Sequence, residues 1–114
     1  MPNPLKGEID LDIGGENYKA RLTIDAIIRI EQAIGCGIIK LAQRMADADI
    51  SVTDVTSVLT AALRGGGNDV TTKEVHKIIT NAGIIEATTA VATLLTAAIS
   101  PTDDSDEGSK KKGS

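Results

Sequence analysis

Side chains that could carry catalysis or bind a metal ion are few in this 114-residue sequence. His76 is the sole histidine and Cys36 the sole cysteine, so a zinc site built from the usual histidine and cysteine ligands is excluded. A catalytic Cys–His pair would require these two residues to meet in the fold without any other motif to support them. We interpret His76 as a surface residue and Cys36 as a small side chain between two glycines, and we expect no enzymatic activity.

Two further patterns imitate known ligand sites. Asp47, Asp49 and Ser51 have the spacing of the first calcium ligands of an EF-hand loop, but valines occupy its sixth and twelfth positions, where glycine and glutamate are needed. The glycines at 65–67 are not followed by the Gly-Lys-Ser/Thr of a phosphate-binding loop, and we interpret them as a helix stop followed by a flexible loop. The sequence therefore predicts no metal, no cofactor and no small-molecule ligand.

Composition narrows the class of partner. The formal net charge of −4 disfavours nucleic acid, because a phosphate-binding surface needs clustered lysine and arginine. Tyr18 is the only aromatic residue, so a protein partner would be held by aliphatic side chains, backbone groups or charge. The most apolar stretch, Gly83 to Ile99, is shorter than the ~20 residues of a membrane span. With one cysteine and no signal-peptide pattern, we expect a reducing cytoplasm and no membrane contact.

A β-hairpin is predicted near the start of the chain. Apolar side chains recur at every second position on both sides of Gly14-Gly15, namely Ile9, Leu11, Ile13, Tyr18, Ala20 and Leu22. Two glycines supply the positive φ that a tight hairpin turn requires. Because an isolated hairpin is marginal in water, this one either covers a helical core or leaves an edge open for a strand of another protein.

Five helices are predicted after the hairpin, over residues 24–34, 38–48, 52–64, 72–82 and 84–99. Thr23 can cap the first helix, and glycines follow the first and fourth helices. The pairs Ser51 with Asp54 and Thr71 with Glu74 have the spacing of capping boxes. We therefore expect an α+β fold, with an N-terminal β-hairpin followed by a compact bundle of about five α-helices in a single domain over residues 1–100.

The fifth predicted helix, Ile84 to Ile99, is apolar on almost every side, with Glu86 as its only charged residue. Such a helix must be covered on more than one side, either as the central helix of this domain or by a second subunit. Together with the hairpin, it supplies the candidate partner-binding residues, which are Ile9, Leu11, Ile13, Tyr18, Leu22, Val91 and Leu95. These are also the places where we expect self-association.

Residues 101–114 form the end of the given sequence. From Thr102 onward they contain no apolar side chain, so they cannot repay the entropy of ordering. We expect a disordered C-terminal tail.

Three stretches resemble a known family. They are Gly7-Glu8 with Gly14-Gly15 and Tyr18, Ile30-Glu31 followed by Gly35 and Gly37, and Ala61-Ala62-Leu63-Arg64 running into glycine. In this combination the chain, from about Asn3 to Ile99, resembles the tail assembly chaperone family of gene transfer agents and tailed phages, a small family sometimes labelled a phage tail tube protein. None of these stretches is a catalytic motif.

The resemblance implies a non-enzymatic factor of the host cytoplasm. Such a factor would bind the long helical tape measure protein, and contact the tail tube protein, while the tail tube polymerises. Two alternatives from other classes remain open. A structural tail tube subunit would need more sheet than one hairpin to pair with its neighbours, and a small regulatory protein-binding module would need no tail partner.

Lys110, Lys111 and Lys112 lead to a prediction about the gene. Many phage tail chaperones are made in two lengths by ribosomal frameshifting, and an A-rich lysine run can form a slippery site. A disordered linker after Pro101 would tether the added module without disturbing the core. The expected result is a heptameric slip site and an overlapping downstream frame in the nucleotide sequence; without them, the lysines are only a soluble terminus or a cloning remnant.

Overall fold

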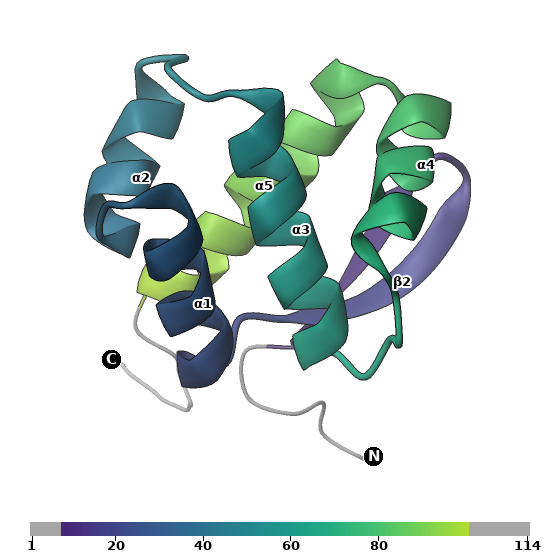
Figure 1. Cartoon of the computed structure of the whole chain (residues 1–114). Coiled ribbons are helices and arrows are strands. Elements are labelled where there is room, and N and C mark those ends of the chain that lie inside the picture. The colour runs from purple at the N-terminus through teal and green to yellow at the C-terminus, as the bar shows by residue number, and fades with distance from the viewer. Residues whose placement is uncertain (1–7, 101–114) are drawn as a thin grey trace, which may run out of the picture.

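The computed structural model describes residues 8–100, and the predicted tail lies outside this range. Its elements, in chain order, are β1 (Glu8–Ile13), β2 (Glu16–Arg21), α1 (Ile24–Ile34), α2 (Ile38–Ala46), α3 (Val52–Gly65), α4 (Thr72–Ala82) and α5 (Ile84–Ile99). Figure 1 shows the hairpin at one side of the helices and α5 crossing behind α3. The expected α+β fold, a hairpin followed by five helices, is confirmed over the described residues.

The hairpin has the predicted turn and faces. Gly14 and Gly15 have φ angles of 62° and 83°, which side chains other than glycine rarely adopt. The strands pair antiparallel, with Leu11 opposite Tyr18 and Ile13 opposite Glu16. Because side chains alternate between faces, the odd-numbered residues of β1 pack on the helices, and the even-numbered ones face solvent.

Helix α3 lies at the centre of the molecule. It contacts α1, α4, α5 and β2, as its middle position in Figure 1 indicates. Its buried side chains are Asp54, Val55, Thr56, Val58, Leu59, Thr60, Ala62 and Leu63. Burial on nearly every side explains why this stretch of the sequence carries so few charges.

The glycines at 65–67 end α3, as expected, but they have a second role. The helix continues through Gly65, one residue further than predicted, and Gly66 caps it. A Cβ at Gly65 would overlap the carbonyl oxygen of Arg21, and a Cβ at Gly66 would overlap that of Lys19. These glycines therefore let the helix end lie directly against β2, which is a packing role that the composition of the loop did not reveal.

Three of the predicted helix starts are confirmed. The Thr23 side chain accepts a hydrogen bond from the Ala26 amide, and the capping boxes at Ser51 and at Thr71 are both complete. The end of α2 was predicted wrongly, at Ala48 instead of Ala46. Ala48 has a left-handed φ of 59°, a conformation that a right-handed helix excludes.

An ion pair joins α2 to the start of α3. Arg44 donates to Asp54 Oδ2 at 2.8 Å, and the same oxygen accepts from the Ser51 amide at 3.0 Å. Arg44 also lies 3.4 Å from Asp49 and donates to the Cys36 sulfur at 3.8 Å, and the latter hydrogen bond contributes most to raising the pKa of Arg44. This contact between two helices was not among the predictions from the sequence.

Helix α5 is a central helix, one of the two roles considered for it. It contacts β1, α2, α3 and α4 and buries Ala87, Ala90, Val91, Leu94 and Leu95. Threonines occupy much of its exposed face, and the hydroxyls of Thr89 and Thr93 donate to backbone carbonyls one turn earlier. The helix is therefore covered on its apolar side by its own domain.

Replacing Gly66 with alanine tests the contact between α3 and β2. Gly66→Ala should lower the free energy of unfolding by about 1–3 kcal/mol, because the new methyl group overlaps backbone atoms that cannot rotate away. Urea denaturation followed by circular dichroism measures the change. Gly37→Ala is the comparison, since its Cβ would meet only ordinary contact at 3.6 Å and the variant loses only the preference for glycine at the N-cap of α2, about 1 kcal/mol or less; a loss at Gly66 no larger than that at Gly37 would contradict the packing role.

Replacing Asp54 tests the ion pair together with the capping box. Asp54→Ala should cost about 2 kcal/mol, because it leaves the Arg44 guanidinium without its nearest carboxylate and the Ser51 amide without an acceptor. A double-mutant cycle with Arg44→Met separates the two effects by denaturant unfolding. A coupling energy of zero between the two positions would show that the pair adds nothing to stability.

Candidate partner-binding surfaces

The predicted hairpin residues fall into two groups. Leu11 and Ile13 are fully buried within the domain, so a partner cannot reach their side chains in this conformation. Ile9, Tyr18 and Leu22 are half-buried and pack against the same core. The apolar face of the hairpin is thus occupied by the chain's own helices, and a contact with a partner could use only the rims of these three side chains or the strand edges.

The two predicted residues of α5 are also buried. Val91 belongs to the core between α5 and its neighbours. Leu95 is nearly inaccessible, although it lines the floor of a groove of about 420 Å³ between α2 and α5, together with Met45 and Ile99. Leu95 could therefore be only the base of a partner site on this side of the molecule.

The solvent face of the hairpin carries cross-strand polar pairs. The Lys19 side chain donates to the Asp10 carboxylate at 2.6 Å, and the side-chain amide of Asn17 donates to the Asp12 carboxylate at 2.8 Å. The hydrogen bond with Asp10 raises the pKa of Lys19, so in alkaline solution this lysine keeps its charge to a higher pH than an isolated lysine does. Both side chains are well exposed, which makes their contribution to stability small.

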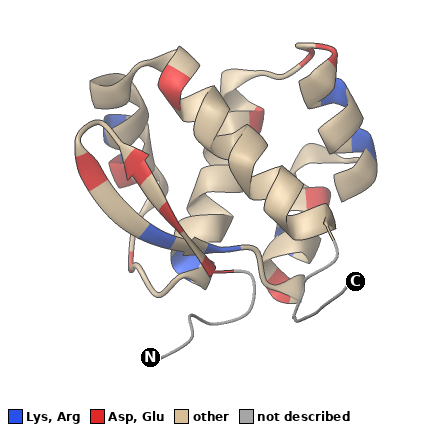
Figure 2. Cartoon of the chain, turned by 180° about the vertical axis from the view of Figure 1, so that it is seen from behind, with Lys and Arg blue, Asp and Glu red and all other residues tan. Residues whose placement is uncertain are grey.

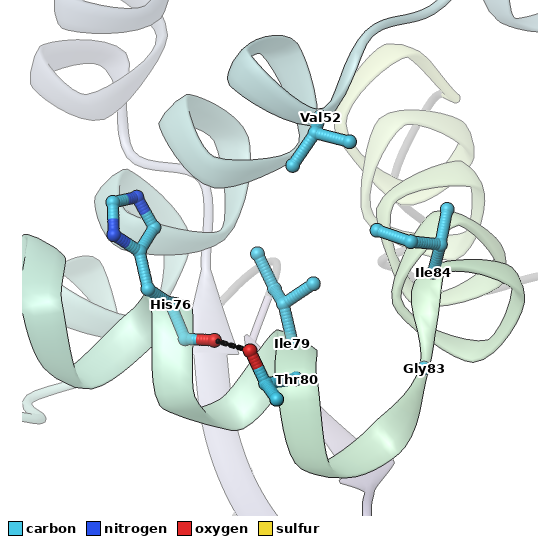
Figure 3. Close-up of a pocket in the computed structure, with 6 residues that line it drawn as sticks. All are labelled: Val52, His76, Ile79, Thr80, Gly83 and Ile84. Carbon is cyan, nitrogen blue, oxygen red and sulfur yellow. Dashed lines mark hydrogen bonds between the residues drawn. The ribbon is translucent and has the colours of Figure 1, made fainter.

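An apolar groove opens where α3, α4 and α5 meet. It has a volume of about 440 Å³ and is lined by Val52, His76, Ile79, Thr80, Gly83 and Ile84. In Figure 3, the aliphatic side chains come from three elements and surround one space, with the His76 ring to one side. The Thr80 hydroxyl donates to the His76 carbonyl at 2.9 Å, so it is satisfied within its own helix. The groove therefore offers aliphatic surface and few polar groups that a ligand would have to satisfy.

Three aliphatic side chains in or next to this groove are exposed to solvent. Ile85 is 81% exposed, and Val52 and Ile84 are each about half exposed. No prediction from the sequence covered this surface, because aliphatic side chains at helical spacing ordinarily indicate the side that faces the core. A signal was present: adjacent isoleucines in the first turn of a helix point in directions about 100° apart, so both cannot face the same core.

The residues considered for chemistry lie apart. Cys36 lies between α1 and α2 beside Arg44, whereas His76 is exposed on α4 at the apolar groove. Within residues 8–100, no three histidine, cysteine or acidic side chains are grouped so that they could hold a metal ion. No single helix in that range is long and apolar enough to cross a membrane; α4 and α5 reach that length and composition only as a pair bent by 116°.

Comparison with known proteins identifies the family. No curated protein and no solved structure matches the chain. A family model described as phage tail tube protein, GTA-gp10, matches residues 6–100, which include every described helix and strand. The match agrees with the resemblance found in the sequence, and it makes the protein a component of a phage or gene transfer agent tail system. The chain belongs to the phage tail tube protein, GTA-gp10, family.

Proposed function

We propose that this protein is a non-enzymatic tail assembly chaperone that binds the tape measure protein in the host cytoplasm. The observation that carries the proposal is the open apolar groove between α3, α4 and α5, whose lining includes the half-exposed side chains of Val52 and Ile84. Grooves of this kind hold the apolar face of an amphipathic helix. A long helical tape measure protein presents many such faces.

The composition of the groove suits binding that must later be reversed. Its lining is mainly aliphatic, with His76 and Thr80 as the polar members, and it contains no tryptophan or tyrosine, the residues in which tight hot spots are enriched. A chaperone has to leave its client when the tube closes around it. Modest affinity at several sites along the client meets that requirement better than one tight site.

A structural tail tube subunit is the second candidate, and the description of the family favours it. Tube subunits assemble by extensive contacts between neighbours, often through sheet. Only a two-stranded sheet is present among the described residues, which is little surface for such pairing. The two candidates differ in where the protein is found: a tube subunit remains in the finished tail, and a chaperone does not.

Ile84→Asp tests the groove, because Ile84 belongs to its lining. Co-purification with the tape measure protein of the same gene cluster should fall at least tenfold, because a carboxylate at the rim would be desolvated against an apolar helix. The protein should still fold, since Ile84 is about half exposed in the first turn of α5, where an acidic residue suits the helix dipole. Circular dichroism and thermal melting check the fold.

Ile24→Asp is the matched control, because Ile24 is 73% exposed in the first turn of α1 and does not line the groove. Its co-purification should match that of the unchanged protein, and an equal loss in both variants would contradict a groove-specific role. Mass spectrometry of purified tails provides the second readout. Many copies per tail would replace the chaperone proposal with the tube subunit.

A further inference from the structure

The backbone of β1 has a fixed outward side. In an antiparallel hairpin, the amide and carbonyl of each residue both point either toward the partner strand or away from it, and the direction alternates along the strand. The two-residue turn makes Ile13 and Glu16 a mutually bonded pair. Counting back from this pair, the residues of β1 whose backbone groups point away from β2 are Glu8, Asp10 and Asp12.

The position of Lys19 supports this assignment. Lys19 is opposite Asp10 in the register, and its carbonyl accepts from the Asn68 side chain at 2.6 Å, outside the hairpin. The Lys19 carbonyl therefore points away from β1, and by the same alternation the backbone groups of Asp10 point away from β2.

The two edges of the sheet differ in how they are closed. The β2 edge is closed by Asn68 and by Gly65 and Gly66 of the α3 end. On β1, within residues 8–100, no hydrogen bond reaches the outward amides and carbonyls of its three acidic residues. The first amide past the strand, that of Gly14, donates to Glu86 of α5 at 2.6 Å, so the helices hold the tip of the hairpin, while no described residue pairs with the outer edge of β1.

The same three residues place carboxylates along the edge. The side chains of Asp10 and Asp12 are exposed on the solvent face, and acidic positions recur along the strand in Figure 2. Acidic side chains are a known means of protecting an open edge from pairing with other copies of itself. Here this protection follows from the alternation of backbone directions along the strand. In an antiparallel pair, outward residues must face outward residues, so in every register of two β1 edges carboxylates oppose carboxylates.

A second copy is therefore a poor occupant, and charge complementarity identifies a better one. We propose that the β1 edge binds an extended segment of another protein that carries lysine or arginine at every second position. The backbone of this segment would pair with the outward amides and carbonyls of Glu8, Asp10 and Asp12. Its basic side chains would lie directly opposite the carboxylates of these three residues. The site is separate from the apolar groove and does not depend on the chaperone proposal.

The experiment uses the full-length protein and a synthetic peptide of alternating lysine and valine. NMR amide exchange should show at least tenfold slower exchange at the Asp10 and Asp12 amides when the peptide is bound. A peptide of alternating glutamate and valine is the control and should give no protection. Equal binding of both peptides, or protection confined to other elements, would overturn the proposal.

Asp10→Pro separates strand pairing from simple charge attraction. The Asp10 amide points outward, so proline removes no hairpin hydrogen bond and is tolerated on such an edge, but it removes the central donor and blocks the approach of a strand. Binding of the lysine-valine peptide should be lost, whereas Asp10→Asn, which keeps the amide, should bind only a few-fold more weakly. Undiminished binding by a folded Asp10→Pro variant would refute strand addition.

A triple variant tests whether the three carboxylates prevent two β1 edges from pairing. Replacing Glu8, Asp10 and Asp12 with threonine removes the opposed charges and keeps residues that favour strands. Sedimentation should show that this variant self-associates at concentrations where the unchanged protein does not. If the triple variant associates no more than the unchanged protein, the carboxylates do not control which strand the edge accepts.

Discussion

The fold depends on how a hairpin that could not persist alone is attached to the helices. Two strands in water are marginal, and these are held at two points. The glycine end of α3 lies against the backbone of β2, and the carboxylate of Glu86, in the first turn of α5, accepts from the turn amide of Gly14. Between these points, Leu11, Ile13 and Ala20 complete the core. Because α3 and α5 also contact the other helices, the hairpin attachment and the bundle stabilise each other.

This arrangement explains which features of the molecule the sequence could predict. Periodicity and capping are local, so the turn at Gly14-Gly15, the capping boxes and the five helices followed from short stretches. The close approach of Gly65 and Gly66 to β2 joins segments far apart in the chain, and a run of glycine is ambiguous between a loop and such a contact. Arg44 could not be paired with Asp54 because an amphipathic pattern shows which face a residue occupies, not which neighbour it meets.

The candidate partner residues had the same limitation. An alternating strand and an apolar helix show that burial is needed, but they do not show whether the cover comes from the same chain. Here the domain supplies most of it, and Leu11, Ile13, Val91 and Leu95 are buried. What remains for a partner is of a different kind: an aliphatic groove near Ile84 and Ile85, and an acidic strand edge. Both surfaces suit proteins that meet during assembly, in keeping with a tail-related family.

The half-buried Tyr18 also has an optical consequence. The sequence contains no tryptophan and no phenylalanine, so this tyrosine, on β2 opposite Leu11, is the source of the aromatic ultraviolet signal of the chain. Fluorescence and near-ultraviolet dichroism therefore report on the hairpin alone, whereas far-ultraviolet dichroism is dominated by the helices. A comparison of the two signals during unfolding would reveal whether the strands detach before the bundle melts, without any label.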